Sequence, residues 1–328
     1  MILVTGGAGF IGSNILAALE ERGAGKLVAC DRLRSNDKWR NIAKRELADL
    51  VHPEQLFDFL EANRKHMEVI FHMGAISSTT ETDADKIAAN NFSLSLALWK
   101  WCAMNNVRFI YASSAATYGD GKQGFDDDWS MEHLAKLRPL NAYGWSKQLF
   151  DRRVARKISV GSRRPPQWAG LKFFNVYGPN EYHKGNQQSV VSQVHPHAES
   201  NGPFQLFRSH HPDYKDGGQL RDFIWIGDCV NVMMWLLDNP LVNGIFNVGT
   251  GKARSFLDLA SAVYRSLGKE PQIKFRDTPI EIRDKYQYFT EANMARLRQA
   301  GYDKPFTSLE EGVAKYVHDF LAAPDPYR

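Results

Sequence analysis

Gly7-Ala8-Gly9-Phe10-Ile11-Gly12 lies close to the N-terminus, and the residues on both sides of it decide the fold. Met1 to Val4 is a short apolar run of strand-forming residues, and Ser13 to Glu21 has the pattern of a helix. A second apolar run, Leu27 to Cys30, ends at Asp31, about 20 residues after the last glycine. Strand, glycine turn, helix, strand and acidic residue together form the dinucleotide fingerprint in its required context. The sequence therefore predicts a βαβ unit that binds a dinucleotide, with the pyrophosphate at the helix N-terminus.

Composition narrows the class of protein. The chain has 328 residues, of which 43% are hydrophobic and 24% charged, so it can bury a core and form one or two domains. Net charge is +4, and the one basic cluster, between Arg152 and Arg164, has the pattern of a solvated helix and loop. We therefore expect no nucleic-acid partner.

The apolar segments, the cysteines and the histidines indicate where the protein is located and whether it binds a metal. No apolar stretch approaches the ~20 residues of a membrane span, and the first strand leaves no room for a signal peptide. The expected location is the cytoplasm, without membrane attachment. Cys30, Cys102 and Cys229 have no metal-ligand spacing and are expected to be buried thiols in a reducing compartment. No metal is expected, and the histidines between positions 195 and 211 are interpreted as loop residues: His195, His197, His210 and His211.

Strand and helix signals alternate through the first half of the chain. Further strands are expected at Val69 to His72, Arg108 to Ala112 and Leu171 to Val176, and helices at Asn90 to Asn106 and Leu140 to Ile158, the last capped by Asn141. This alternation predicts an α/β fold, a Rossmann-type doubly wound parallel sheet with ligands at the carboxyl ends of its strands.

The second half is less regular. We expect a loop-rich insertion at His195 to Gly218, strands at Arg221 to Asp228 and Gly244 to Gly249, and helices at Cys229 to Asp238, Ser255 to Leu267 and Leu309 to Leu321. The predicted division assigns residues 1–170 and about 219–243 to the dinucleotide-binding domain. Residues 171–218 and 244–328 would form a smaller, mainly C-terminal substrate-binding domain.

Tyr143 and Lys147 lie four residues apart on a predicted helix and therefore on one face of it. Ser114 follows a sheet strand, where a substrate beside a nicotinamide ring would lie. A tyrosine must lose its proton before it can accept one from an alcohol, and a nearby ammonium group lowers its pKa. The Ser114 hydroxyl can bind the same substrate oxygen. These three residues are the first candidates for catalysis.

These motifs, taken together, resemble the extended short-chain dehydrogenase/reductase family. The matching segments span the larger part of the chain: Thr5 to Gly12, Asp49-Leu50, Ser113 to Gly119, Tyr143 to Lys147, Phe174 to Pro179 and Arg221-Asp222-Phe223. Many members convert nucleotide sugars by transient oxidation. The resemblance implies cofactor contacts from Gly6, Gly9, Phe10, Ile11, Gly12, Asp31, Arg32, Lys38, Asp49, Met73, Gly74, Ala75, Ser77, Asn90, Tyr143, Lys147 and Val176.

Within that family, other segments look like the ADP-heptose 6-epimerases. They are Ser77-Ser78-Thr79-Thr80-Glu81, His183-Lys184-Gly185, Tyr286-Gln287 and the run from Ala300 to Phe306. This similarity implies epimerisation at C6″ of an ADP-activated heptose of the lipopolysaccharide core, a bound NADP and a homo-oligomer, for which a pentamer is one candidate. The sequence differs from the pattern of these epimerases at two places near the expected sugar pocket. Asn186 stands where the pattern has a small hydroxyl residue, and the segment Ser209 to Leu220 is longer than the corresponding segment of the pattern.

The cofactor residues leave alternatives. Asp31 by itself favours NAD, because a carboxylate binds an unmodified ribose. Arg32 and Lys38 could neutralise a 2′-phosphate or be surface charges, and the resemblance favours NADP. Asp49 could meet the adenine amino group or cap its own loop.

Lys184 is the candidate for a second acid/base, with a surface lysine as the alternative. An epimerase that returns hydride to the opposite face must serve two substrate orientations, and each needs a proton acceptor. His183 could take that role instead.

Expected substrate contacts are Ser114, Asn175, Lys184, Asn186, Gln193, Phe207, Arg208, Arg221 and Tyr286. Arg221 suits a diphosphate, although a salt bridge to Asp222 or Asp228 is also open. Tyr286 could lie near the nucleotide or have a packing role.

The predicted function is thus NADP-dependent epimerisation of ADP-D-glycero-D-manno-heptose to its L-glycero epimer. A UDP-hexose 4-epimerase or a 4,6-dehydratase is the nearest alternative. Ala115-Ala116 stands where a dehydratase resembling this family carries an acid pair, which argues against elimination. A non-catalytic cofactor-binding module is the alternative from another class, and Ser114, Tyr143 and Lys147 together argue against it.

Overall fold

The short apolar runs predicted as strands form one parallel sheet, because every residue of β1, β2 and β4 is buried and the helices cover both faces. The computed structural model describes residues 1–283 and 287–328. Its seven-stranded sheet has the order β10-β6-β5-β4-β1-β2-β3. The strand bounds are β1 (Ile2–Thr5), β2 (Leu27–Cys30), β3 (Asp49–Val51), β4 (Val69–His72), β5 (Arg108–Ser114), β6 (Trp168–Phe173) and β10 (Gly244–Val248).

The strand order reverses between β1 and β4. From β1 the chain proceeds outward through β2 and β3, and it then returns to the other side of β1 with β4 and β5. Thr5, at the end of β1, is paired in register with both Cys30 and His72, so three strands end together at this point. Ligands of doubly wound sheets bind in the crevice that such a reversal opens at the carboxyl ends.

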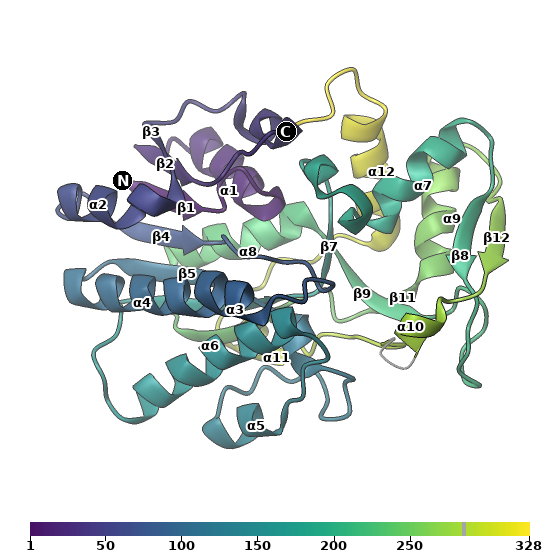
Figure 1. Cartoon of the computed structure of the whole chain (residues 1–328). Coiled ribbons are helices and arrows are strands. Elements are labelled where there is room, and N and C mark those ends of the chain that lie inside the picture. The colour runs from purple at the N-terminus through teal and green to yellow at the C-terminus, as the bar shows by residue number, and fades with distance from the viewer. Residues whose placement is uncertain (284–286) are drawn as a thin grey trace.

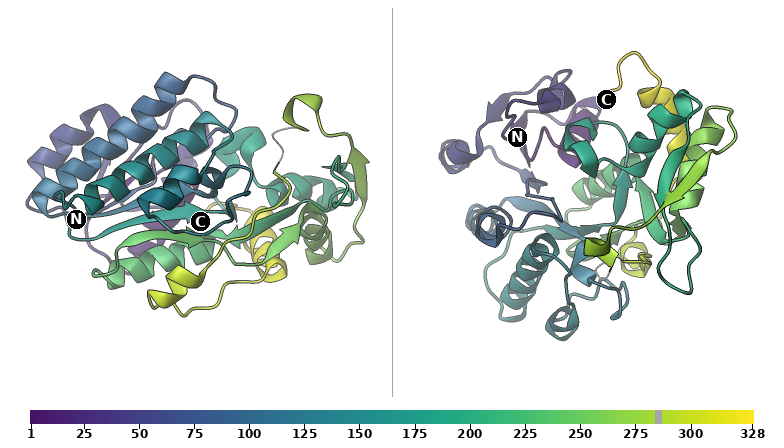
Figure 2. Two further views of the ribbon diagram at one scale, coloured as in Figure 1. Left: turned by 90° about the horizontal axis from the view of Figure 1, so that it is seen from below. Right: turned by 45° about the vertical axis from the view of Figure 1, so that its right-hand side comes forward.

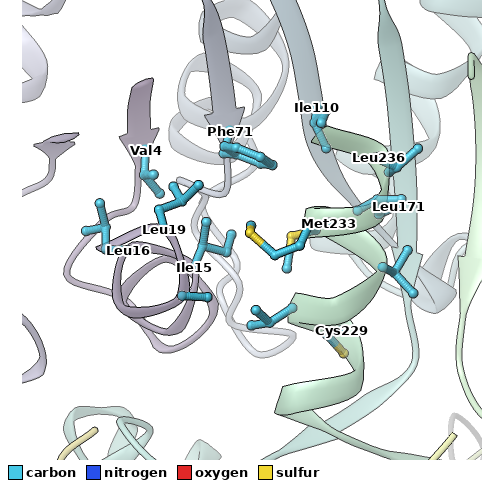
Figure 3. Packing of buried hydrophobic residues seen from close by; sticks show 14 of the residues in the cluster. Val4, Ile15, Leu16, Leu19, Phe71, Ile110, Leu171, Cys229, Met233 and Leu236 are labelled. Atoms are coloured by element: carbon cyan, nitrogen blue, oxygen red, sulfur yellow. The ribbon is translucent and has the colours of Figure 1, made fainter. Parts of the chain in front are cut away.

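Helices cover both faces of this sheet (Figures 1 and 2). On one face α1 (Phe10–Glu21) packs beside α8 (Ile226–Asp238), and α11 (Ala295–Gln299) lies against β10. Figure 3 shows Ile15 of α1 on the side that faces Met233 of α8, while Leu16 and Leu19 lie nearer Val4 of β1. The other face is covered by α2 (Leu56–Ala62), α4 (Leu94–Asn105) and α6 (Ala142–Ser159).

A second part of the molecule holds two smaller sheets, to the right in Figure 1. One has the order β11-β9-β7, with β7 (Asn175–Tyr177), β9 (Leu220–Trp225) and β11 (Ala253–Ser255); the other pairs β8 (Phe204–Phe207) with β12 (Ile273–Arg276). Their apolar core includes residues of α7 (Val190–Glu199), α9 (Phe256–Ser266) and α12 (Leu309–Tyr316). Ser255 and Ser308 each form a capping box that fixes the start of α9 and α12.

The remaining elements are short. The 3₁₀ and π turns are η1 (Asp37–Ile42), η2 (Pro53–Gln55), η3 (Ala88–Ser93), η4 (Ala115–Tyr118), η5 (Tyr182–Gln187) and η6 (Val317–Leu321); the short α-helices are α3 (Ala84–Ile87), α5 (Met131–Lys136) and α10 (Ile280–Arg283). In the described part of the chain, no helix has the length and apolar character needed to cross a membrane.

The predicted α/β class and parallel sheet are confirmed, and the Asn141 side chain caps α6 by accepting a hydrogen bond from the Gly144 amide at 2.8 Å. The three cysteines are buried as free thiols, as expected. The helix predicted from Ser13 begins earlier, at Phe10. The helix predicted from Asn90 continues a helical path that starts at Ala84.

Three expectations about the chain beyond Gly170 are wrong. Residues 195–218 are not all loop, because α7 and β8 fall partly within them and His195 and His197 lie in α7. Pro196 accounts for the wrong prediction of a loop, because proline usually interrupts a helix but lies inside α7 here. The buried side chains of α7 are spaced as on one helical face. The strand predicted at residues 171–176 is two strands, β6 and β7, which belong to different sheets.

The third correction concerns β10. The predicted boundary assigns residues from 244 onward to the substrate domain, yet β10 pairs in parallel with β6 in the main sheet. Every residue of β10 is buried, so this strand needs helices on both of its faces. The main sheet, which has helices on both faces, provides that environment. The rest of that division stays a proposal.

Candidate active site

A cavity of about 630 Å³ opens at the carboxyl ends of β1, β2, β4 and β5. Nearly all the residues predicted to contact the cofactor line it: Gly6, Gly9, Phe10, Ile11, Gly12, Asp31, Arg32, Lys38, Met73, Gly74, Ala75, Ser77, Asn90, Tyr143, Lys147 and Val176. The candidate catalytic residues Ser114 and Lys184 also line it. Local motifs far apart in the sequence thus meet where the strand order reverses.

The glycine turn forms a close backbone cradle at the floor of this cavity. The Gly9 amide donates to the Gly6 carbonyl at 2.9 Å, and α1 begins at the next residue. A Cβ atom at Gly12 would lie 2.2 Å from the Gly6 oxygen, and one at Gly6, whose φ is +65°, would lie 2.7 Å from the Gly74 amide nitrogen. Only glycine fits both positions, so the turn stays tight and leaves the first amides of α1 free for a pyrophosphate.

Asp31 follows β2 and is held by the loops around it. Its carboxylate accepts hydrogen bonds from the Ala8 amide at 2.9 Å and from the Arg32 amide at 2.7 Å, and it pairs with the Lys38 ammonium at 2.5 Å. Arg32, Lys38 and Arg34 all line the cavity here, so the end of β2 is strongly basic.

Asp49 does not reach this cavity. It lies exposed at the start of the edge strand β3, where its carboxylate accepts from the Leu50 amide at 2.7 Å. Its own contacts favour the alternative in which it caps its loop.

Ser114, Tyr143 and Lys147 are brought together by β5 and α6. Burial raises the pKa of Tyr143, and a hydrogen bond with Ser114 lowers it. The Lys147 ammonium donates to the Ala112 carbonyl at 2.7 Å. Burial lowers the pKa of Lys147 to about 8, and the negative charge of Asp151 opposes that shift. A partly buried phenol beside a hydroxyl and an ammonium group is suited to moving a proton to and from a substrate alcohol.

A buried ion pair lies behind these three residues. Asp151, one helical turn beyond Lys147, accepts from Lys172 at 2.9 Å, from the Ser113 hydroxyl at 2.6 Å and from the Tyr111 hydroxyl at 3.0 Å. Asp151 is fully buried and Lys172 is 1% exposed. The pair therefore fixes α6, which carries Tyr143, to β5 and β6.

Lys184 enters the cavity from η5. Its ammonium lies 3.8 Å from a carboxylate oxygen of the fully buried Glu181 and 5.0 Å from the centre of the Phe10 ring. Burial lowers the pKa of Lys184, and Glu181 raises it. A partly desolvated lysine of this kind gives up its proton more readily than a surface lysine does.

Several predicted substrate contacts lie outside the main cavity. Asn175, Asn186 and Gln193 are exposed on β7, η5 and α7; Phe207 and Arg208 lie on and just after β8; and Arg221 is nearly buried on β9, with its guanidinium 5.6 Å from the centre of the Phe256 ring. Tyr286 lies outside the described residues. The longer segment at residues 209–220 packs His211 and Tyr214 against Tyr288.

The comparisons agree with this geometry. The model of the NAD dependent epimerase/dehydratase family matches residues 2–249. The chain belongs to this family.

Full-length relatives in the family are epimerases. An ADP-L-glycero-D-manno-heptose-6-epimerase of Nitratidesulfovibrio vulgaris is 50% identical, and one of Fusobacterium nucleatum is 48% identical, each over the whole of both chains. Among solved structures, the ADP-L-glycero-D-manno-heptose-6-epimerase of Helicobacter pylori has a TM-score of 0.78 at 28% identity and covers 96% of this chain and 94% of that one. This member of the epimerase/dehydratase family is therefore an epimerase, and its cavity is that of a nicotinamide dinucleotide.

The same comparison includes a relative with another sugar. The UDP-glucose 4-epimerase of Thermus thermophilus, solved with NAD, has a TM-score of 0.73 at 25% identity and covers 95% of this chain and 96% of that one. The epimerase fold alone therefore does not choose between sugars or between NAD and NADP.

Sequence reasoning missed several residues of the site. Arg34, Ile76 and Lys86 line the cavity, and the buried pair Asp151–Lys172 supports it. Lys86 had a usable signal, because it lies one helical turn before the predicted contact Asn90. Arg34 had another, because it belongs to the same basic run as Arg32.

Proposed function

We propose that this epimerase inverts C6″ of an ADP-activated heptose, converting ADP-D-glycero-D-manno-heptose to ADP-L-glycero-D-manno-heptose with a bound NADP. The observation that carries the proposal is the presence of two separate proton-transfer candidates, Tyr143 and Lys184, in the lining of one cavity. The names of the full-length relatives support the same substrate.

The residues divide the chemistry between them. Bound NADP supplies a hydride acceptor that returns the hydride in the same cycle. Tyr143, with Ser114 on its hydroxyl and Lys147 one turn away, accepts the proton of the C6″ hydroxyl in one substrate orientation. Lys184 is the acceptor in the orientation that presents the opposite face. After the carbonyl has turned to the other orientation, the second group donates a proton to the oxygen as it is reduced. A cycle therefore begins with one group deprotonated and the other protonated, and it ends with these two states exchanged.

His183 is poorly suited to this second role. Its Nδ1 atom is enclosed, because it lies 3.1 Å from the side-chain amide nitrogen of Asn41. Burial lowers the pKa of His183 to about 4, so the ring is neutral at neutral pH. A ring with so low a pKa binds a proton weakly, so His183 is a poor proton acceptor for a substrate hydroxyl.

NADP is favoured over NAD by charge. Arg32 and Arg34 line the cavity where β2 ends, and a 2′-phosphate needs positive groups of this kind. Asp31 does not oppose this choice, because Lys38 already neutralises its carboxylate.

The remaining site assignments belong to the same proposal. The substrate contacts would come from Asn175, Asn186, Gln193, Phe207, Arg208, Arg221 and Tyr286, which would have to close on the ADP and sugar. The protein would act in the cytoplasm as a homo-oligomer, with a pentamer as one candidate form. Light scattering coupled to gel filtration measures that state.

Turnover of defined nucleotide sugars tests the proposal. Purified protein is incubated with ADP-D-glycero-D-manno-heptose and, separately, with UDP-glucose, and the configurations at C6″ and C4″ are read by NMR. The expected result is inversion at C6″ of the ADP-heptose only. Inversion at C4″ of UDP-glucose would replace the assignment, and the absence of turnover with both sugars would favour a binding module.

A further inference from the structure

Asn41 is a buried polar residue that the proposed chemistry does not use. It lies in η1, is 1% exposed and contacts two other loops through its side-chain nitrogen. That nitrogen donates its two hydrogens to the Ala8 carbonyl at 2.8 Å and to the Asn180 carbonyl at 3.0 Å, and it lies 3.1 Å from Nδ1 of His183. One amide group thus joins η1, the glycine turn and the segment that leads to Lys184.

The orientation of this amide is dictated by its partners. Two of the three are carbonyl oxygens, so the nitrogen must face them. Its Oδ1 atom is buried and, in the described part of the chain, has no hydrogen-bond partner. An unpaired buried acceptor costs about 1–3 kcal/mol. The hydrogen bonds made by the nitrogen must outweigh that cost, so they hold the three segments together firmly.

The segment that Asn41 holds is fixed from several sides. Asn180 is fully buried and has a φ of +72°, and its side chain donates to the Ser13 hydroxyl at 3.0 Å and accepts from the Arg328 amide at 3.0 Å. The Pro179 carbonyl accepts from the Asn14 side chain at 3.0 Å. The backbone before Lys184 therefore rests on the start of α1, and Asn41 ties it to η1.

The other end of the bridge reaches the adenosine side of the cavity. Lys38 lies on η1 three residues before Asn41 and pairs with Asp31. The Asp31 carboxylate also holds the Ala8 amide, while Asn41 holds the Ala8 carbonyl. A displacement of η1 therefore changes the position of Lys38, the glycine turn and the Lys184 segment together.

We propose that Asn41 is a positioning residue that sets the place of Lys184 relative to the bound cofactor by bridging η1, the glycine turn and the Asn180–His183 segment. The inference rests on the proposed role of Lys184 and adds a residue through which that role depends on the cofactor loops. Lys184 has no rigid element of its own, because η5 is a short turn broken at Gly185.

A double-mutant cycle tests this. Asn41→Ala, Lys184→Met and the double variant are compared for kcat and KM on the ADP-heptose, for NADP affinity and for thermal stability. Displacing a catalytic group by about 1 Å can cost about 100-fold in rate, so Asn41→Ala should lower kcat by about 10- to 100-fold. In the Lys184→Met background the same substitution should change kcat by less than about twofold, because no positioned lysine remains to be lost.

Two further variants make the result interpretable. Asn36→Ala removes the exposed side chain that caps η1 but keeps the bridge, and it should lower kcat much less than Asn41→Ala does. Asn41→Ser keeps one donor, should show an intermediate loss, and replaces Asn41→Ala in the cycle if the latter does not fold.

The possible failures are distinct. If Lys184→Met retains full activity, the role of Lys184 falls, and the positioning role of Asn41 falls with it. In the second case, Lys184→Met lowers kcat, and adding Asn41→Ala to it lowers kcat by the same factor as Asn41→Ala does in the wild-type protein. The role of Lys184 is then supported, and the inference about Asn41 is overturned.

Discussion

Replacing Lys172 with Met is expected to destabilise the protein and to change the pH dependence of its reaction. The substitution removes the ammonium that pairs with Asp151 at 2.9 Å, and the carboxylate keeps only the hydroxyl donors of Ser113 and Tyr111. Both charged groups are buried, so no water can replace the lost partner. Met fills much of the same volume, which limits the effect to the charge.

The expected loss follows from that burial. Breaking a buried ion pair on one side costs about 3–5 kcal/mol, because the remaining charge is uncompensated. With an unfolding entropy of about 2.1 cal/mol/K per residue, the melting temperature of a chain of 328 residues should fall by about 4–7 °C. Asp151→Asn, which leaves the Lys172 charge behind, should cost a similar amount.

The two variants should shift activity in opposite directions. Lys147, whose pKa is about 8, must be protonated to favour the Tyr143 phenolate, so kcat should fall as pH rises through about 8. Asp151→Asn removes the negative charge that raises this pKa, so the alkaline fall should begin at lower pH. Lys172→Met removes a positive charge that offsets Asp151, so the fall should begin at higher pH.

The measurement is kcat against pH at saturating substrate, below each variant's melting temperature, together with thermal unfolding at each pH. If the alkaline fall in kcat moves to lower pH in Asp151→Asn and to higher pH in Lys172→Met, with equal destabilisation, the Asp151–Lys172 pair controls the pKa of Lys147. Displacement of both profiles in the same direction, or unchanged profiles, would refute the electrostatic link and leave the pair a purely structural role.

Three further outcomes are expected. Tyr143→Phe should lower turnover by about 10²–10⁴-fold with an unchanged melting temperature, and near-normal turnover would remove Tyr143 from the chemistry. Gly12→Ala should weaken cofactor binding and stability by about 1–3 kcal/mol, because its Cβ would meet the Gly6 oxygen at 2.2 Å; Gly202→Ala, with no such contact, is the matched control. Arg32→Ala should weaken NADP binding by about 10- to 100-fold and leave NAD binding unchanged; recovery of NAD alone from freshly purified protein would contradict the choice of NADP.

Local signals were sufficient for the βαβ unit and for the cap of α6. The glycine turn, Asp31 and the Asn141 cap each act on residues close to them in the sequence, so their geometry can be read directly from spacing. The Tyr143–Lys147 spacing is likewise set by one helix. The resemblance to a family supplied Lys184, which no spacing rule singles out.

Contacts between distant segments could not be predicted. Asn41 meets Asn180 across 139 residues of chain, and no local pattern marks either as a partner of the other. The second part of the molecule was harder for the same reason: Pro196 concealed α7, and β10 returns to a sheet whose adjacent strand β6 is far away in the sequence.

That return of β10 means that neither part of the molecule is a continuous piece of chain. The chain leaves the large sheet after β6 and returns to it with α8. It leaves a second time and returns with β10, and at its end the Arg328 amide donates to the Asn180 side chain. A fragment that stopped before Leu220 would lack α8 and β10, so the free edge of β6 and the apolar side chains that face Met233 would meet water (Figure 3). Such a fragment would aggregate through an open strand edge. The interleaved path thus makes each part of the molecule depend on the other to complete its fold, and the parts are joined by several connecting segments rather than by a single linker.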